Sequence, residues 1–165
     1  MTEHTFHESW PQLLAILMPF LSRCGAAVLC GAIIGIEREF KGKPAGFRTN
    51  ILICLGSAMY MSVGLLLSHE GGESGSDPTR IAAQVVTGIG FIGAGCIIQE
   101  RGRVSGLTSA ATIWVVAAIG IISGAGFPVL AFISSVIVGI TLSALGWVEQ
   151  RYLDPDTSDD LRKED

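Results

Sequence analysis

The chain has 165 residues, of which 49% are hydrophobic and only 16% are charged, with a net charge of −4 at pH 7. Ordinary globular proteins carry about 25% charged residues, and the mean hydropathy here is +0.52, so an ordinary soluble domain is excluded. The 21 glycines are nearly twice the usual share of about 7%. They favour a polytopic membrane protein, because small residues let helices approach closely in lipid.

Charge-free runs mark the predicted membrane spans. The first run is 24–36, and the segment that precedes it from Trp10 is expected to lie at the membrane interface, with the tryptophan as an aromatic anchor. The second run is 50–68 and the third is 81–98. Each of the last two is long enough to cross a bilayer as a helix.

The last charge-free run, 104–148, is far too long for one crossing. The Gly and Pro residues of 124–128 predict a turn that divides it into two spans. The sequence therefore predicts an all-α membrane protein, a bundle of about five transmembrane helices.

Basic residues set the expected orientation, because lysine and arginine are retained on the cytoplasmic side. They cluster at 38–48, at 101–103 and after Val148, whereas the loop 69–80 holds three acidic residues and a single basic one. We therefore expect the N-terminus outside and the C-terminus inside. The expected domains are an external N-terminus with the interfacial segment (1–22), a transmembrane domain (23–148) and an acidic cytoplasmic tail (149–165).

Small residues recur at helical spacing, which predicts close helix packing within the chain or with another copy. The ladders are Ala27, Gly31 and Gly35 in the first span, Gly120 and Gly124 in the fourth, and Ser135, Gly139 and Ser143 in the fifth.

Residues 88–93 contain the spacing G-x-G-x-x-G, which is typical of a dinucleotide-binding turn. Such a turn follows a buried strand, yet residues 80–84 show no strand periodicity and the run stays apolar as far as Ile98. We therefore expect no nucleotide ligand and interpret the glycines as part of a membrane-spanning helix.

Gly88, Gly90, Gly93 and Gly95 leave two interpretations open. Close helix packing predicts that leucine at Gly88 or Gly93 would force helices apart. A local break is the alternative, because each glycine weakens a helix by up to about 1 kcal/mol relative to alanine, and a broken helix offers carbonyl groups to an ion. A neighbouring face carries Ala83, Thr87, Gly90 and Ala94.

Charged residues flank the first loop. Glu37 and Arg38 close the first span, and Arg48 opens the second. Glu37 is the more embedded acid of its segment, and we expect it to pair with Arg38 or Arg48, with ion binding as the alternative.

The third span begins with Asp77 and Pro78, the residue types of a helix N-cap and first helical position. Asp77 has a second interpretation, ion attraction at the outer mouth. Gln84 lies one turn deeper, is the most polar side chain inside any predicted span, and ranks above Asp77 as a functional candidate.

Residues 99–109 form a polar approach to the fourth span and include Gly106. Ser105 or Thr108 is expected to cap that helix, whose positive end favours an anionic partner or a lipid headgroup. The four cysteines lie in apolar stretches without a CxxC pair and are interpreted as small buried side chains. No catalytic constellation is visible, so we expect no enzyme, no cofactor and no nucleic acid partner, and the metal question stays open.

Four stretches together resemble the MgtC/SapB family of membrane proteins: GAIIGIERE at 31–39, KPAGFRTN at 43–50, RIAAQVVTGIGFIGAG at 80–95 and GLTSAATIWVVAAIG at 106–120. The resemblance implies a bacterial inner-membrane protein tied to magnesium limitation, acid stress and virulence. By motif it directs interest to Glu37, Arg38, Arg48, Arg80, Gln84, the glycines Gly88, Gly90, Gly93 and Gly95, and the stretch from Gly106 to Thr108.

Many relatives continue into a soluble ACT-like domain, whereas only 17 residues follow Val148 here, so functions of that domain are not carried over. The leading hypothesis is a membrane regulator that contacts other membrane proteins, such as transporters or the F-type ATP synthase, with a homodimer also open. The alternative is a magnesium or proton transporter or channel that uses Glu37, Gln84 and a break at 88–95.

Overall fold

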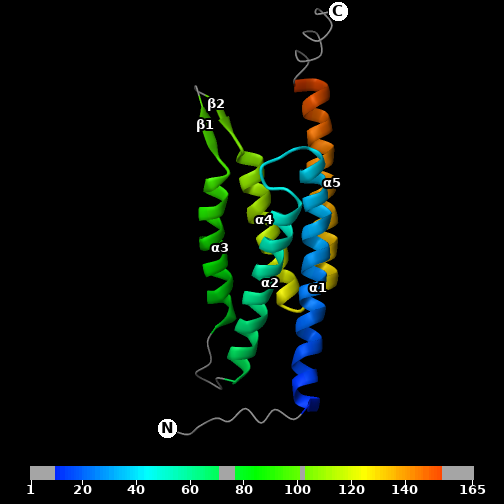
Figure 1. Cartoon of the computed structure of the whole chain (residues 1–165), viewed down its shortest axis with the longest axis vertical. Coiled ribbons are helices and arrows are strands. Elements are labelled where there is room, and N and C mark those ends of the chain that lie inside the picture. The colour runs from blue at the N-terminus through cyan, green and yellow to red at the C-terminus, as the bar shows by residue number, and fades with distance from the viewer. Residues whose placement is uncertain (1–9, 71–76, 101–102, 154–165) are drawn as a thin grey trace, which may run out of the picture.

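The computed structural model describes residues 10–70, 77–100 and 103–153, so the outer parts of the predicted N-terminal segment and tail lie outside the described residues. The described chain is a bundle of five α-helices with its two described ends at opposite ends of the bundle (Figure 1). The elements are α1 (Trp10–Phe40), α2 (Phe47–Glu70), α3 (Pro78–Gly95), β1 (Ile98–Glu100), β2 (Arg103–Ser105), α4 (Leu107–Gly124), α5 (Pro128–Val148) and a π-helical turn η2 (Glu149–Leu153).

The predicted all-α, multi-pass fold is confirmed. Among the described helices, α1, α2, α4 and α5 are long and apolar enough to cross a membrane. The fifth helix, α3, has 18 residues and includes the polar Arg80 and Gln84, and it falls outside that set. The turn predicted between the last two spans is present, because α4 ends at Gly124 and α5 begins at Pro128. Which end of the bundle faces the cytoplasm stays a prediction.

Helix α1 is longer than the first predicted span. It runs without interruption for 31 residues, about 46 Å at 1.5 Å per residue, against about 30 Å of hydrocarbon core. The segment expected at the interface is therefore helical and continuous with the span. Its apolar side chains, among them Trp10, Leu14 and Met18, are exposed on the described chain.

Glycines set the contacts of α2 with its neighbours. A Cβ atom added to Gly31 of α1 would lie 2.8 Å from the Asn50 carbonyl oxygen, and one added to Gly35 would lie 2.9 Å from the Phe47 Cα. A Cβ atom on Gly120 of α4 would collide with the Cys54 carbonyl oxygen. These ladders therefore pack inside the chain, as expected for helices that associate through small residues.

The other ladders show the same use of small residues to different degrees. Gly124 of α4 meets the backbone of Ala58 on α2, so a Cβ atom there would also collide. In α5, Ser135 is fully buried and Gly139 faces Ile33 of α1, whereas Ser143 is exposed. Only the first two positions of the α5 ladder therefore face the bundle.

Helix α3 lies at the edge of the bundle opposite α5 (Figure 1). It contacts α4 through Gly93, where an added Cβ atom would lie 3.6 Å from the Ala110 carbonyl oxygen, and its helix is unbroken to Gly95. Added Cβ atoms at Gly88, Gly90 and Gly95 would meet nothing within 4 Å. Close packing within the chain is therefore wrong for these three glycines, and a local break is wrong for the whole helix.

The chain between α3 and α4 forms a β-hairpin that was not predicted from the sequence. The third span was expected to continue to Ile98, but α3 ends at Gly95 and β1 pairs antiparallel with β2, with Gln99 opposite Val104. The physical reason is the close return of the backbone: Gly106 has φ +86°, and a Cβ atom there would collide with the Cys96 carbonyl oxygen.

The expected cap of α4 is also wrong. Its N-cap is Gly106, which has no side chain to donate or accept a hydrogen bond. The Ser105 hydroxyl donates instead to the Ile98 carbonyl oxygen across the hairpin at 3.4 Å. Thr108 contributes its backbone carbonyl oxygen, which accepts from the Thr112 hydroxyl at 2.7 Å.

Candidate functional site

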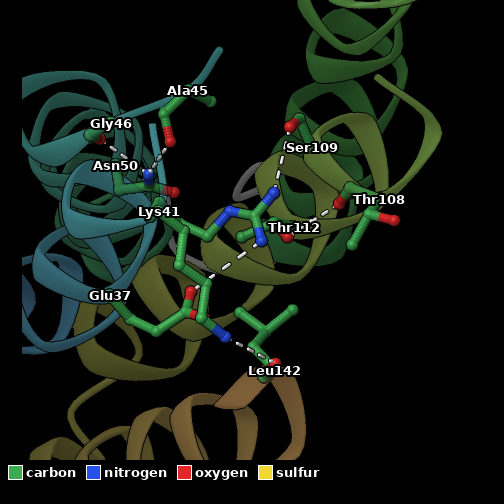
Figure 2. Close-up of polar contacts among 10 residues, drawn as sticks. Glu37, Lys41, Ala45, Gly46, Asn50, Thr108, Ser109, Thr112 and Leu142 are labelled. Carbon is green, nitrogen blue, oxygen red and sulfur yellow. Dashed lines mark hydrogen bonds and ion pairs between the residues drawn. The ribbon is translucent and has the colours of Figure 1, made fainter. Parts of the chain in front are cut away.

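A cluster of polar side chains, most of them buried, lies where the end of α1 meets α2, α4 and α5 (Figure 2). It consists of Glu37 and Arg38 from α1, Lys41 directly after the end of α1, Asn50 from α2 and Ser109 from α4. We call this set the polar cluster. Arg38 is 2% exposed and Asn50 is fully buried, which is unusual for a guanidinium and an amide in a helical bundle.

Glu37 is held by two cations. Its side chain is 12% exposed, Lys41 Nζ lies 2.7 Å from its Oε1, and Arg38 Nη1 lies 3.8 Å from its Oε2. The predicted pair with Arg38 is present, and the shorter pair, with Lys41 one helical turn away, was not predicted. Arg48 is exposed at the start of α2 and makes no ion pair with Glu37 in the described structure.

The charged guanidinium of Arg38 lies inside the bundle. Its Nη2 donates to the Ser109 hydroxyl of α4 at 3.0 Å (Figure 2), whereas its Nε has no hydrogen-bond partner among the described residues. A buried cation is costly unless it is paired and hydrogen-bonded. Glu37 therefore supplies the counter-charge that lets α1 present a guanidinium to α4.

Asn50 fixes the loop between α1 and α2. Its Nδ2 donates to the carbonyl oxygens of Ala45 at 2.8 Å and Gly46 at 2.7 Å, and its Oδ1 has no partner within the described part of the chain. Glu39 closes the same loop, because its Oε2 accepts from the Phe47 backbone N–H at 2.8 Å and so caps α2. Asn50 was not predicted as a site residue. Its position as an amide at the start of the charge-free run 50–68 was the sequence feature that could have indicated it.

The second group of predicted residues gathers elsewhere, in a groove of about 1010 Å³ between α2 and α3. Asp77, Arg80, Gln84 and Gly88 line it from α3 and its N-cap. Gln84 is exposed to this groove rather than buried. The remaining lining residues are mostly apolar: Leu52, Ile53, Gly56, Ser57, Tyr60, Val63, Leu67, Ile81, Val85, Ile89 and Ile92. We call this the α2–α3 groove.

Asp77 is the N-cap of α3, as predicted, with Pro78 in the first turn. Its side chain accepts from the Thr79 backbone N–H at 2.9 Å and from the Thr79 hydroxyl at 2.7 Å. These two hydrogen bonds favour the charged form and hold the pKa of Asp77 below its ordinary value.

The polar cluster and the charged end of the α2–α3 groove are far apart. Ile81 of α3 packs against Gly64 of α2, and Gly64 is 14 residues from Asn50, about 21 Å along a helix. The candidates Glu37 and Arg38 therefore lie at one end of α2, and Asp77, Arg80 and Gln84 lie towards the other.

The structure also shows why the G-x-G-x-x-G spacing of 88–93 is not a dinucleotide-binding turn. Gly88, Gly90 and Gly93 lie inside α3, and the strands of the hairpin follow this helix instead of preceding it. Backbone N–H groups inside a helix are already hydrogen-bonded, so they cannot cradle a pyrophosphate as a strand-to-helix turn does. Among the described residues, no group of three or more His, Cys, Asp or Glu side chains is placed to hold a metal ion.

A model of the MgtC family matches residues 25–151, which include both the polar cluster and the α2–α3 groove. The chain belongs to the MgtC family.

Several curated MgtC-family relatives are similar over most of this chain. The putative magnesium transporter YhiD of Escherichia coli K12 is 50% identical over 124 residues, 71% of this chain and 55% of that protein. Protein MgtC of Brucella abortus is 44% identical over 119 residues, 72% of this chain and 48% of its own length. Protein SapB of Bacillus subtilis is 40% identical over 135 residues, 79% of this chain and 58% of its own length.

The chain thus spans about half the length of the curated MgtC-family proteins that it matches. No solved structure matches it. The family match and the four apolar helices together make this a multi-pass membrane protein.

Proposed function

We propose that this MgtC-family protein is a non-enzymatic regulator in the bacterial inner membrane that works by helix contact with another membrane protein. The partner classes that the family resemblance suggests are transporters and the F-type ATP synthase. The physiological setting that it suggests is magnesium homeostasis, acid stress and virulence-related adaptation. A homo-oligomer is compatible with this role.

The outward face of α3 carries the proposal. Ala83, Thr87, Gly90 and Ala94 recur at helical spacing and are all exposed, and a Cβ atom on Gly90 would meet nothing within 4 Å. Helices associate in lipid through such small side chains. Gly31 and Gly35 of α1 and Gly120 and Gly124 of α4 make contacts inside the chain, whereas this face of α3 is left for a helix from outside it.

Transport is the competing candidate, and two observations favour it. One relative is named a putative magnesium transporter, and two kinds of oxygen lie in the polar cluster: Asn50 Oδ1, which has no hydrogen-bond partner among the described residues, and the Glu37 carboxylate, which is paired with cations. Magnesium prefers oxygen ligands in octahedral geometry. However, Arg38 and Lys41 already surround Glu37, and this excess of positive charge opposes a divalent cation.

The packing of the bundle also supports regulation over transport. At Gly120, α2 and α4 approach so closely that one methyl group would collide with the backbone. Such contact leaves no water-filled passage at that crossing, and a transported ion needs a hydrated or oxygen-lined path.

Co-purification after mild crosslinking in magnesium-poor cells tests the proposal. Gly90→Leu should remove the partner, whereas Gly25→Leu should retain it, because Gly25 of α1 also has open space around its added Cβ atom. Recovery of a homo-oligomer alone would contradict the proposal. Magnesium or proton flux into proteoliposomes under a gradient would instead support the transporter.

A further inference from the structure

We propose that the α2–α3 groove binds one phospholipid whose headgroup carries both a phosphate and a primary amine. The groove lies between two helices of a membrane-embedded bundle, on a different face of α3 from the small outward residues Ala83, Thr87, Gly90 and Ala94. This binding is independent of the protein partner proposed above, so either can fail without the other.

The charged end of the groove matches such a headgroup. Asp77 and Arg80 both line it, so a carboxylate and a guanidinium stand about one helical turn apart on the same helix. Arg80 is exposed and makes no ion pair among the described residues, and a guanidinium can hold a phosphate through two hydrogen bonds. Asp77 is held in its charged form by Thr79 and can accept from an ammonium group.

The polarity of the groove falls along its length in the order of a phospholipid. Gln84 lies four residues beyond Arg80, about 6 Å deeper, where an amide N–H can donate to the ester carbonyls that follow a phosphate. Beyond it, the α3 side of the groove consists of Val85, Gly88, Ile89 and Ile92. On α2, the lining residue Ser57 is 4% exposed, and the exposed Tyr60 contributes a mainly apolar ring, so the deep end is suited to acyl chains.

The length of the groove also fits one leaflet. Asp77 and Ile92 are 15 positions apart, about 22 Å along a helix, and half of a bilayer with its headgroup region is about 20–22 Å thick. A transmembrane helix would be the other occupant, but it offers small or apolar side chains along its whole length. It would offer no polar group to Arg80 or Gln84 and no cation to Asp77.

Native mass spectrometry of the full chain, released from nanodiscs with equal parts phosphatidylethanolamine, phosphatidylglycerol and phosphatidylcholine, tests the proposal. The wild type should retain phosphatidylethanolamine well above its share. Arg80→Gln should lower the retention of every phospholipid roughly tenfold, since it removes the phosphate contact. Asp77→Asn should remove the preference for the primary amine while it keeps the fold, because asparagine caps a helix as well as aspartate does.

Filling the groove provides the second variant. Gly88→Trp has room, because an added Cβ atom there meets nothing within 4 Å, and it should abolish lipid retention without lowering the thermal stability in detergent. Gly25→Trp on α1 is the matched control and should retain lipid as the wild type does. Equal retention of the three lipids by the wild type, or unchanged retention in Gly88→Trp, would overturn the proposal, as would crosslinks between two copies through cysteine at Gly88.

Discussion

Lys41 Nζ lies 2.7 Å from Glu37 Oε1, one helical turn along the chain, and the same ammonium donates to the Leu142 carbonyl oxygen of α5 at 3.3 Å. One side chain therefore ties the end of α1 to the last turns of α5 and neutralises a carboxylate that faces the buried Arg38. The polar cluster is a four-helix junction, and its stability depends on the charge balance of three residues.

Glu37→Gln should destabilise the bundle by about 1–3 kcal/mol. The substitution leaves Arg38 and Lys41 without a counter-charge, and breaking a buried ion pair typically costs 3–5 kcal/mol. The estimate is lower because Lys41 is 31% exposed and therefore partly screened by solvent. Chemical unfolding in detergent measures the change, with Lys43→Gln in the exposed loop as the control. The double variant Glu37→Gln with Lys41→Gln should recover part of the stability lost in Glu37→Gln. If the double variant is destabilised as much as the single variant, this account is wrong.

Asn50→Leu should cost about 1–3 kcal/mol of unfolding free energy. The Ala45 carbonyl oxygen loses its buried donor, and an unsatisfied buried group costs about 1–3 kcal/mol, whereas the Gly46 carbonyl oxygen still accepts from the backbone N–H of residue 50. Asn50→Asp should be at least as harmful, because a carboxylate offers no N–H to either carbonyl. Both are measured by thermal unfolding in detergent. A stable Asn50→Asp protein would show that the loop does not depend on these two hydrogen bonds.

Glycine substitutions should separate the two kinds of glycine in this chain. Gly120→Ala and Gly124→Ala should each destabilise by about 1–3 kcal/mol, because the new methyl group meets backbone atoms of α2. Gly90→Ala and Gly95→Ala should be neutral or stabilising by up to about 1 kcal/mol, since they favour the helix and meet open space. Thermal stability in detergent is the measurement. Destabilisation at Gly90 in a monomeric preparation would contradict the exposed position of this face.

Acid should loosen the start of α3. The folded pKa of Asp77 lies below its ordinary value because Thr79 donates two hydrogen bonds to its carboxylate. The charged cap therefore contributes stability above the unfolded pKa of about 3.9, and this contribution is lost as the pH falls through the lower folded value. Hydrogen exchange of the first turn of α3 measures it. Asp77→Asn should keep the cap and show no such pH dependence.

Loop accessibility tests the predicted orientation. In a background without native cysteines, cysteine introduced at Ser74, which lies outside the described residues, should react with an impermeant reagent from the outside. Cysteine at Lys43, an exposed residue in the loop between α1 and α2, should react only after the membrane is opened. The opposite pattern would invert the bundle and place the polar cluster at the outer face.

The fold class and four of the five helices could be predicted closely from the residues alone, because a bilayer requires long apolar runs, which are visible without any knowledge of contacts. The N-cap at Asp77 and the division at Gly124 to Pro128 were equally local, since they depend on residues next to one another in the chain. The spacing of Gly31 and Gly35 predicted a packing surface on α1, but it did not indicate that α2 is the helix that packs there.

Which polar groups meet between helices depends on how the helices pack in three dimensions. Lys41 reaches Leu142 across 101 residues and Arg38 reaches Ser109 across 71, so neither contact follows from helical periodicity. The same holds for the glycines of α3: small side chains look alike in a sequence whether they face a neighbour or open space. Gly93 faces Ala110 and Gly90 faces nothing in the described chain, because α3 lies at the edge of the bundle and has a neighbour on only part of its surface.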